Sequence, residues 1–239
     1  MEMASPPRGD RLVEPRDAAS VLVVDPAVRP WTVLMMRRPS AARFAAGAWA
    51  FPGGSVSTED RTHPDPCRAA GVRELLEEMG LLLGRDLAED SPERVRAGLE
   101  RGLPLERAAA EHGVSPTPEA LVYLARWVTP EASPIRFDCR FYLIRRPQGQ
   151  DVTAHSGEVA EWRWMTPRQA LEDPEVELIY VTRRLLEQVG AHADVEALIG
   201  LLRDRPETPP VLPRLIRGAD GRVERVEDDA APLPDPPGR

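Results

Sequence analysis

The hydrophobic positions of this chain fall into short runs whose spacing predicts strands and helices mixed along its length. Apolar, β-branched runs at 20–24 and 31–36 flank an Asp-Pro turn, which predicts two strands in a hairpin-like unit. Apolar and polar residues alternate at 136–146, and the runs at 121–128 and 162–165 also have strand character. Five strands are therefore expected.

Helical patterns occupy the segments between these strands. The first predicted helix begins with Asp65 as its N-cap and Pro66 in the first helical position, and Gly80 is a C-terminal stop. Later helices are expected after the capping-box pattern Thr166-Pro167-Arg168-Gln169 and near 180–189 and 194–202.

The mixture of elements predicts an α/β sandwich with a mixed sheet. We expect one domain over 17–204, interrupted at 84–116 by an insertion of short amphipathic helices that either lines a substrate pocket or serves as a structural cap. Residues 1–16 are expected to form a loose polar tail. The Pro-rich segment 205–239 carries a hairpin pattern over 214–223, and its last ten or so residues have the composition of a disordered end.

Composition narrows the functional classes. The 239 residues are 42% hydrophobic with a net charge of −8, so neither nucleic acid nor an anionic membrane surface is an expected partner. The 31 basic residues are all arginine, which excludes lysine-based Schiff-base, pyridoxal phosphate and P-loop sites. Cys67 and Cys139 form no CxxC motif, residues 1–16 lack a signal-peptide core, and no apolar run could span a membrane. A cytoplasmic location is therefore expected.

Candidate chemistry lies on the first predicted helix. Glu74, Glu77 and Glu78 are spaced i, i+3, i+4, which places three carboxylates on one face of the helix. Arg73 is the only basic residue next to them in this motif. An acidic helix face is usually just solvated. Three repelling carboxylates also suit a hard divalent cation, because Mg²⁺ prefers carboxylate oxygen. The preceding Phe51-Pro52-Gly53-Gly54 could form a turn, or its glycines could let the backbone approach a ligand closely.

This context resembles the Nudix hydrolase family, whose signature is G-x5-E-x7-R-E-U-x-E-E-x-G-U with U apolar. The left half departs from it, since Asp60 stands where the family has Glu after Gly54. Five extra residues, around 61–65, separate Asp60 from the helix motif, and we expect them only to lengthen a loop. The right half matches at every fixed position: Arg73, Glu74, Leu75, Glu77, Glu78, Gly80 and Leu81.

The resemblance implies a mixed sheet between helices and hydrolysis of a diphosphate linked to another moiety, with Mg²⁺ or Mn²⁺ as cofactor. By motif match, the metal ligands are Glu74, Glu77, Glu78 and the Gly54 carbonyl, while Arg73 would hold a carboxylate in place. A general base must accept the proton of the attacking water. In the family its position varies, and here Glu158 is preferred over Glu161 because it precedes a predicted strand.

Stretches outside the signature resemble the coenzyme A diphosphatases of the peroxisomal type and their bacterial relatives. They include 38–43, 47–54, 125–131 and 136–141. The histidine-containing signature of the other coenzyme A subgroup is missing. Within this branch the substrate would be coenzyme A or acyl-coenzyme A, and the expected substrate-binding residues are Gly53 with Arg37, Arg38 or Arg43, the arginines for the 3′-phosphate.

Two alternatives remain open at this point. One is a Nudix hydrolase of ADP-ribose, dinucleotides or NADH, and the other is a Nudix-fold binding module without catalysis. Asp60 and the five-residue insertion favour the second, whereas the intact glutamate cluster favours an enzyme. The expected partner in each case is a small-molecule nucleotide, and homodimer formation is left open.

Overall fold

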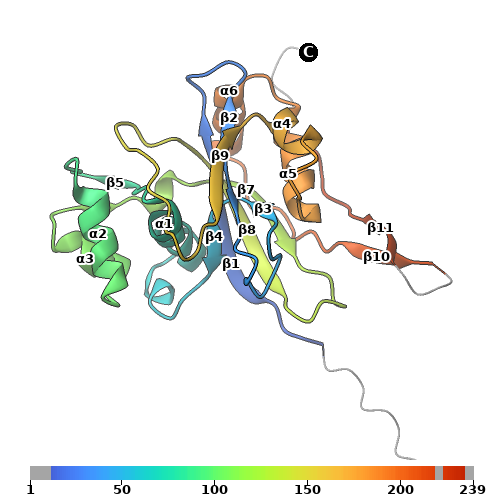
Figure 1. Ribbon diagram of the computed structural model, residues 1–239, viewed down its shortest axis with the longest axis horizontal. Helices are drawn as coiled ribbons and strands as arrows, with labels where there is room; N and C mark the ends of the chain where they lie inside the picture. The colour runs from blue at the N-terminus through green and yellow to red at the C-terminus, as the bar shows by residue number, and fades with distance from the viewer. Residues whose placement is uncertain (1–11, 219–222, 235–239) are drawn as a thin grey trace, which may run out of the picture.

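The computed structural model describes residues 12–218 and 223–234. A mixed sheet lies at its centre, with strand order β3-β2-β1-β8-β7, while β4 pairs with β1 and β9 pairs with β2 (Figure 1). β1 and β8 run parallel, and the other pairs in this sheet are antiparallel. The bounds of its strands are Arg16–Asp25 (β1), Thr32–Arg37 (β2), Trp49–Ala50 (β3), Gly53–Ser55 (β4), Val122–Val128 (β7), Phe137–Arg145 (β8) and Glu161–Met165 (β9).

Helices cover both faces of the sheet, as predicted for an α/β sandwich (Figure 1). Successive residues of a strand point to opposite faces, so Val21 packs with the α1 side and Leu22 with the α5–α6 side. Residues 18–24 of β1 are buried, so this strand is covered on both faces. The helices are α1 (Pro66–Met79) on one side and α4 (Pro167–Glu172), α5 (Tyr180–Gly190) and α6 (Val195–Arg203) on the other.

Local chemistry fixes the ends of α1 as the sequence predicted. The Asp65 carboxylate accepts a hydrogen bond from the Arg68 backbone N–H at 3.1 Å, and Pro66 occupies the first turn. Gly80 ends the helix in the left-handed conformation with φ 69°. The capping box between Thr166 and Gln169 at α4 is also confirmed. No helix in the described ranges is long and apolar enough to cross a bilayer.

The insertion packs on the outer side of α1 (Figure 1). Its helices α2 (Ser91–Glu100) and α3 (Leu105–Ala110) are framed by two short antiparallel strands, β5 (Gly84–Arg85) and β6 (Ser115–Pro116). Val95 and Leu105 are buried in the same core cluster as the apolar residues of α1. Short 3-10 helices precede α1 (Asp60–Thr62) and β7 (Pro118–Ala120).

The C-terminal segment returns to the same core. β10 (Arg214–Arg217) and β11 (Val223–Glu227) form an antiparallel hairpin, as the sequence predicted. The Val211 N–H donates to the Arg126 carbonyl of β7 at 2.8 Å, and Leu233 is buried beside the helices of that face. Residues 219–222, most of the expected N-terminal tail (1–11) and the last five residues of the expected disordered end (235–239) lie outside the described residues.

Candidate functional site

The three glutamates of α1 lie on the side of the helix that faces β4. Glu78 is almost fully buried, with 6% of the residue exposed. The side chains of Glu74 and Glu77 are 15% and 31% exposed. Three carboxylates with this little water around them are costly unless other groups compensate their charge.

The Gly53-Gly54 segment compensates part of the carboxylate charge. It forms an edge strand rather than a turn, and it pairs antiparallel with β1 through Gly54 opposite Ala19. The Gly53 N–H donates to Oε2 of Glu78 at 2.7 Å. A Cβ atom on Gly54 would lie 2.3 Å from Oε1 of Glu74, so only glycine lets the strand approach this carboxylate.

Arg73 gives the second compensation. Its Nη1 lies 2.6 Å from Oε2 of Glu77 and 3.0 Å from Oε1 of Glu74. Its Nε and Nη2 donate to both carboxylate oxygens of Asp60, which is 4% exposed and also accepts the Ser57 N–H. Asp60, which the sequence marked only as a departure from the signature, is therefore the main anchor of Arg73.

The carboxylates hold their protons more tightly than ordinary glutamates. Burial raises the pKa of Glu74 to about 7, with the neighbouring Glu77 also raising it and Arg73 opposing the shift. Burial and the charge of Glu74 raise the pKa of Glu78 well above its usual value, against the hydrogen bond from Gly53. Burial likewise raises the pKa of Glu77. One guanidinium does not neutralise this cluster, so the site favours an additional cation.

The donor chemistry fits a hard divalent cation, because carboxylate oxygens dominate it and the absence of a side chain on Gly54 brings the β4 backbone close to Glu74. The side chains as they lie are engaged with Arg73 and Gly53, and within 12–218 and 223–234 no three acidic, histidine or cysteine side chains form a ready-made ligand set. A bound cation would thus require a local rearrangement of these side chains.

The loop that carries Glu158 is tied to the end of α1. The Thr153 N–H donates to the Met79 carbonyl and the His155 N–H to the Glu78 carbonyl, each at 2.9 Å. Glu158 is exposed, and its charge adds a small increase to the one that burial causes in the pKa values of the α1 glutamates. Glu161, the alternative, instead forms an ion pair with Arg163 at 2.6 Å.

The three arginines selected from sequence lie in different surroundings. Arg38 is half-buried and donates from Nε to the Phe44 carbonyl at 3.1 Å. Burial raises the pKa of Glu78, and the charge of Arg38 opposes this rise only in part. Arg37 is exposed and donates to the Gly47 carbonyl, and Arg43 is exposed. Arg38 lines the pocket described next, whereas Arg37 and Arg43 are not among its lining residues.

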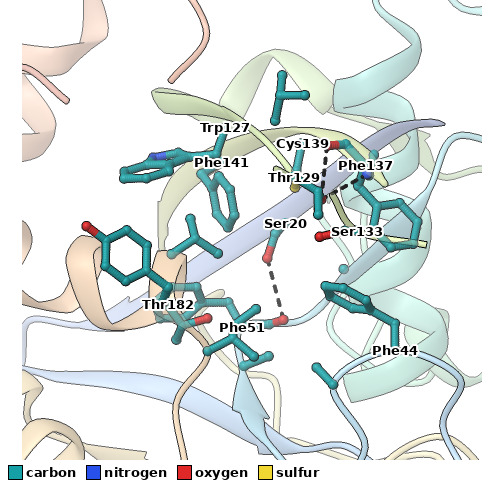
Figure 2. A pocket seen from close by; sticks show the side chains of 18 of the residues that line it. Ser20, Phe44, Phe51, Trp127, Thr129, Ser133, Phe137, Cys139, Phe141 and Thr182 are labelled. Atoms are coloured by element: carbon teal, nitrogen blue, oxygen red, sulfur yellow. Dashed lines mark hydrogen bonds between the residues drawn. The ribbon is translucent and has the colours of Figure 1, made fainter. Parts of the chain in front are cut away.

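A pocket of about 410 Å³, shown in Figure 2, lies next to β4. Gly53, Gly54 and Arg38 form part of its wall, so the β4 strand separates the pocket from the glutamates of α1. No pattern in the sequence indicates this pocket, because its lining residues come from distant segments. Its aromatic lining is Phe44, Phe51, Trp127, Phe137, Phe141 and Tyr180.

Comparison with known proteins identifies the fold and the family. The family model described as "NUDIX domain" matches residues 14–186. The crystal structure of a NUDIX hydrolase from Alicyclobacillus acidocaldarius superposes with a TM-score of 0.69 at 26% identity, covering 82% of this chain and all of that one. "Putative nudix hydrolase 7" of Caenorhabditis elegans is 29% identical over 163 residues, which are 66% of this chain and 54% of that protein. The chain thus spans about half the length of this curated relative.

The family match contains the sheet, α1 with its three glutamates and Arg73, the Gly53-Gly54 strand and the Glu158 loop. The chain belongs to the Nudix family.

Proposed function

We propose that this protein is a metal-dependent hydrolase of the diphosphate bond in a nucleoside diphosphate derivative, with coenzyme A or acyl-coenzyme A as substrate. The products would be 3′,5′-ADP and 4′-phosphopantetheine or its acyl form, with one water consumed. Nudix hydrolases generally act on small nucleotides with divalent metal ions. The choice of substrate within that range is our proposal.

One observation supports the proposal most strongly. The Gly53-Gly54 strand touches the carboxylates on one side, through the 2.7 Å bond from Gly53 to Glu78, and lines the pocket on the other. A diphosphate lying along this strand would face the carboxylate cluster while the group attached to it entered the pocket. The protein carries a net charge of −8, so cations are needed to bring two polyanions together.

We assign each side chain a role from its position. Glu74, Glu77, Glu78 and the Gly54 carbonyl would hold Mg²⁺ or Mn²⁺, which neutralises phosphate oxygens and acidifies water when bound. Arg73, itself fixed by Asp60, orients Glu77. Glu158, on a loop fixed to the end of α1, takes the proton from the attacking water.

The coenzyme A assignment rests on the resemblance of several stretches outside the signature to that branch. Arg38 lines the pocket wall together with Gly53 and Gly54, so we assign this half-buried cation to the diphosphate itself. Arg37 and Arg43 are exposed and stay the proposed partners of the 3′-phosphate.

The test is a product analysis by mass spectrometry in ¹⁸O-labelled water. Coenzyme A, decanoyl-coenzyme A, ADP-ribose, NADH and a dinucleoside polyphosphate are each incubated with Mg²⁺ or Mn²⁺. We expect 3′,5′-ADP from the coenzyme A species, with label in one of the two phosphate-containing products. No product from any substrate would indicate a binding module. Product from the other nucleotides alone would leave a Nudix hydrolase of different specificity.

A further inference from the structure

The C-terminal hairpin forms one wall of the pocket. Pro213, Leu215 and Val226 are among the lining residues, and Leu215 and Val226 are cross-strand partners in the β10–β11 pair. Paired residues of an antiparallel ladder project to the same side, so these two side chains form one apolar surface. The family match ends at residue 186, so this wall lies outside the residues that the family model matches.

A buried acid holds the hairpin in place. The carboxylate of Asp228 follows β11, is 3% exposed and accepts hydrogen bonds from the Tyr180 hydroxyl at 2.5 Å and from Nε of Arg184 at 2.9 Å. Tyr180 also lines the pocket. The contact between Asp228 and Tyr180 therefore joins the hairpin to the pocket wall contributed by α5.

The pocket suits an apolar group better than a nucleobase. Two hydroxyls around it are already engaged. Ser20 donates to the carbonyls of Phe51 and Pro52, and Thr129 is bonded to the backbone of Phe137; Figure 2 shows the bonds to Phe51 and Phe137. Arg38 carries the one charge among the lining residues of the described chain. The buried N–H of Trp127 has no partner in the described structure. Most of the remaining lining is aromatic or aliphatic, which favours an apolar group over a base with several polar edges.

We propose that this pocket binds the apolar acyl group of a thioester substrate and that Leu215 and Val226, on the C-terminal hairpin, determine which chain lengths fit. The inference rests on the proposed function, because the acyl group is placed relative to a diphosphate at Gly53-Gly54. Burial of one methylene group strengthens binding about fourfold, so a closed apolar wall discriminates between chain lengths. The volume of about 410 Å³ falls in the range of small-molecule pockets.

The test uses a probe without phosphate, so that it does not depend on hydrolysis. The dissociation constants of hexanoyl-, decanoyl- and tetradecanoyl-pantetheine are measured by calorimetry with the full chain in EDTA, beside pantetheine and adenosine. We expect decanoyl-pantetheine to bind at least tenfold more tightly than either control. Leu215→Trp, which fills the pocket, should weaken this binding at least tenfold, and Leu215→Ala should shift the preference toward longer chains.

The matched control is Val223→Trp, since Val223 lies on β11, is 44% exposed and does not line the pocket. Its affinity for decanoyl-pantetheine should stay within twofold of the parent. Equal binding of pantetheine and decanoyl-pantetheine, preferential binding of adenosine, or no effect of either Leu215 variant would overturn the inference. Coenzyme A turnover is measured separately, and its absence would count against the proposed function alone.

Discussion

The guanidinium of Arg73 is bound to the carboxylate of Asp60, with Nη2 2.9 Å from Oδ2 and Nε 3.1 Å from Oδ1. Both side chains are largely buried, at 13% and 3% exposure. The pair joins the 3-10 turn before α1 to the glutamate cluster, since Nη1 of the same guanidinium reaches Glu77. Asp60, which departs from the family signature, thus holds Arg73, which matches the signature, in place.

We predict that Asp60→Ala destabilises the fold by about 3–5 kcal/mol, because it leaves a buried guanidinium short of its partner. Urea denaturation of the full chain measures this loss. Glu172→Ala is the control, since it removes the exposed ion pair with Arg168 and should cost about 1 kcal/mol or less. Equal losses for the two variants would show that Asp60 contributes no more than a surface charge.

Neutralising a single carboxylate of the cluster should abolish most activity. Glu77→Gln and Glu78→Gln are each expected to lower kcat/KM by orders of magnitude, because each removes a proposed metal ligand while keeping the side-chain shape. Titration with Mn²⁺ followed by calorimetry should show weaker metal binding in both. If both variants turn over substrate as fast as the parent, the metal site lies elsewhere.

The raised pKa of Glu74 predicts a pH dependence of stability in the absence of metal. Its pKa is about 7 in the folded chain and near 4.5 as an ordinary glutamate, so the unfolded chain loses this proton first. The stabilisation is present below about pH 4.5 and is lost as the pH rises through about 7. In EDTA, the Tm of the parent should therefore fall more between pH 5 and pH 7.5 than that of Glu74→Gln.

Metal binding should compensate for this loss. Because a cation needs the deprotonated carboxylate, the increase in Tm on adding Mn²⁺ should be larger at pH 7.5 than at pH 5. Identical pH profiles for the parent and Glu74→Gln in EDTA would contradict the assignment of this titration to Glu74.

The insertion offers a further prediction through Arg96 of α2. Its Nη1 donates to the Thr153 carbonyl at 2.6 Å, in the loop that carries Glu158. We expect Arg96→Ala to lower kcat roughly 10-fold with little change in KM, as loss of a supporting contact does. Hydrogen exchange of the Thr153 and His155 amides should also accelerate. Arg94→Ala is the matched control, because Arg94 pairs with exposed Asp90 on the outside of the same helix.

If Arg96→Ala leaves both kcat and the exchange of these amides at parental values, the insertion does not position the Glu158 loop. An equal effect of Arg94→Ala would show only that α2 had been destabilised.

The elements that sequence predicted well are those with local causes. Asp65 starts α1 because its side chain accepts a backbone hydrogen bond, and Gly80 ends the helix because it adopts the left-handed conformation. The capping box at Thr166 starts α4 through side-chain hydrogen bonds. The one-face spacing of the glutamates likewise follows from helix geometry alone. The Nudix fold and family, inferred from the signature, are confirmed.

The features that sequence missed depend on contacts between distant residues. Gly53-Gly54 forms a strand because β1 offers it a partner, and local composition cannot reveal that pairing. Arg73 reaches Asp60 across the 3-10 turn, although the five added residues made the two look disconnected. The pocket is assembled from the sheet, α5 and the C-terminal hairpin, whose side chains show no shared pattern along the chain.

The account is tested most directly by kcat/KM for coenzyme A, dephospho-coenzyme A and ADP-ribose under one Mg²⁺ or Mn²⁺ condition. A charge-assisted hydrogen bond to the 3′-phosphate is worth about 1.5–3 kcal/mol, so we predict that coenzyme A exceeds dephospho-coenzyme A by roughly 10- to 100-fold. ADP-ribose should be slower than coenzyme A. Equal or faster turnover of ADP-ribose would contradict the coenzyme A assignment.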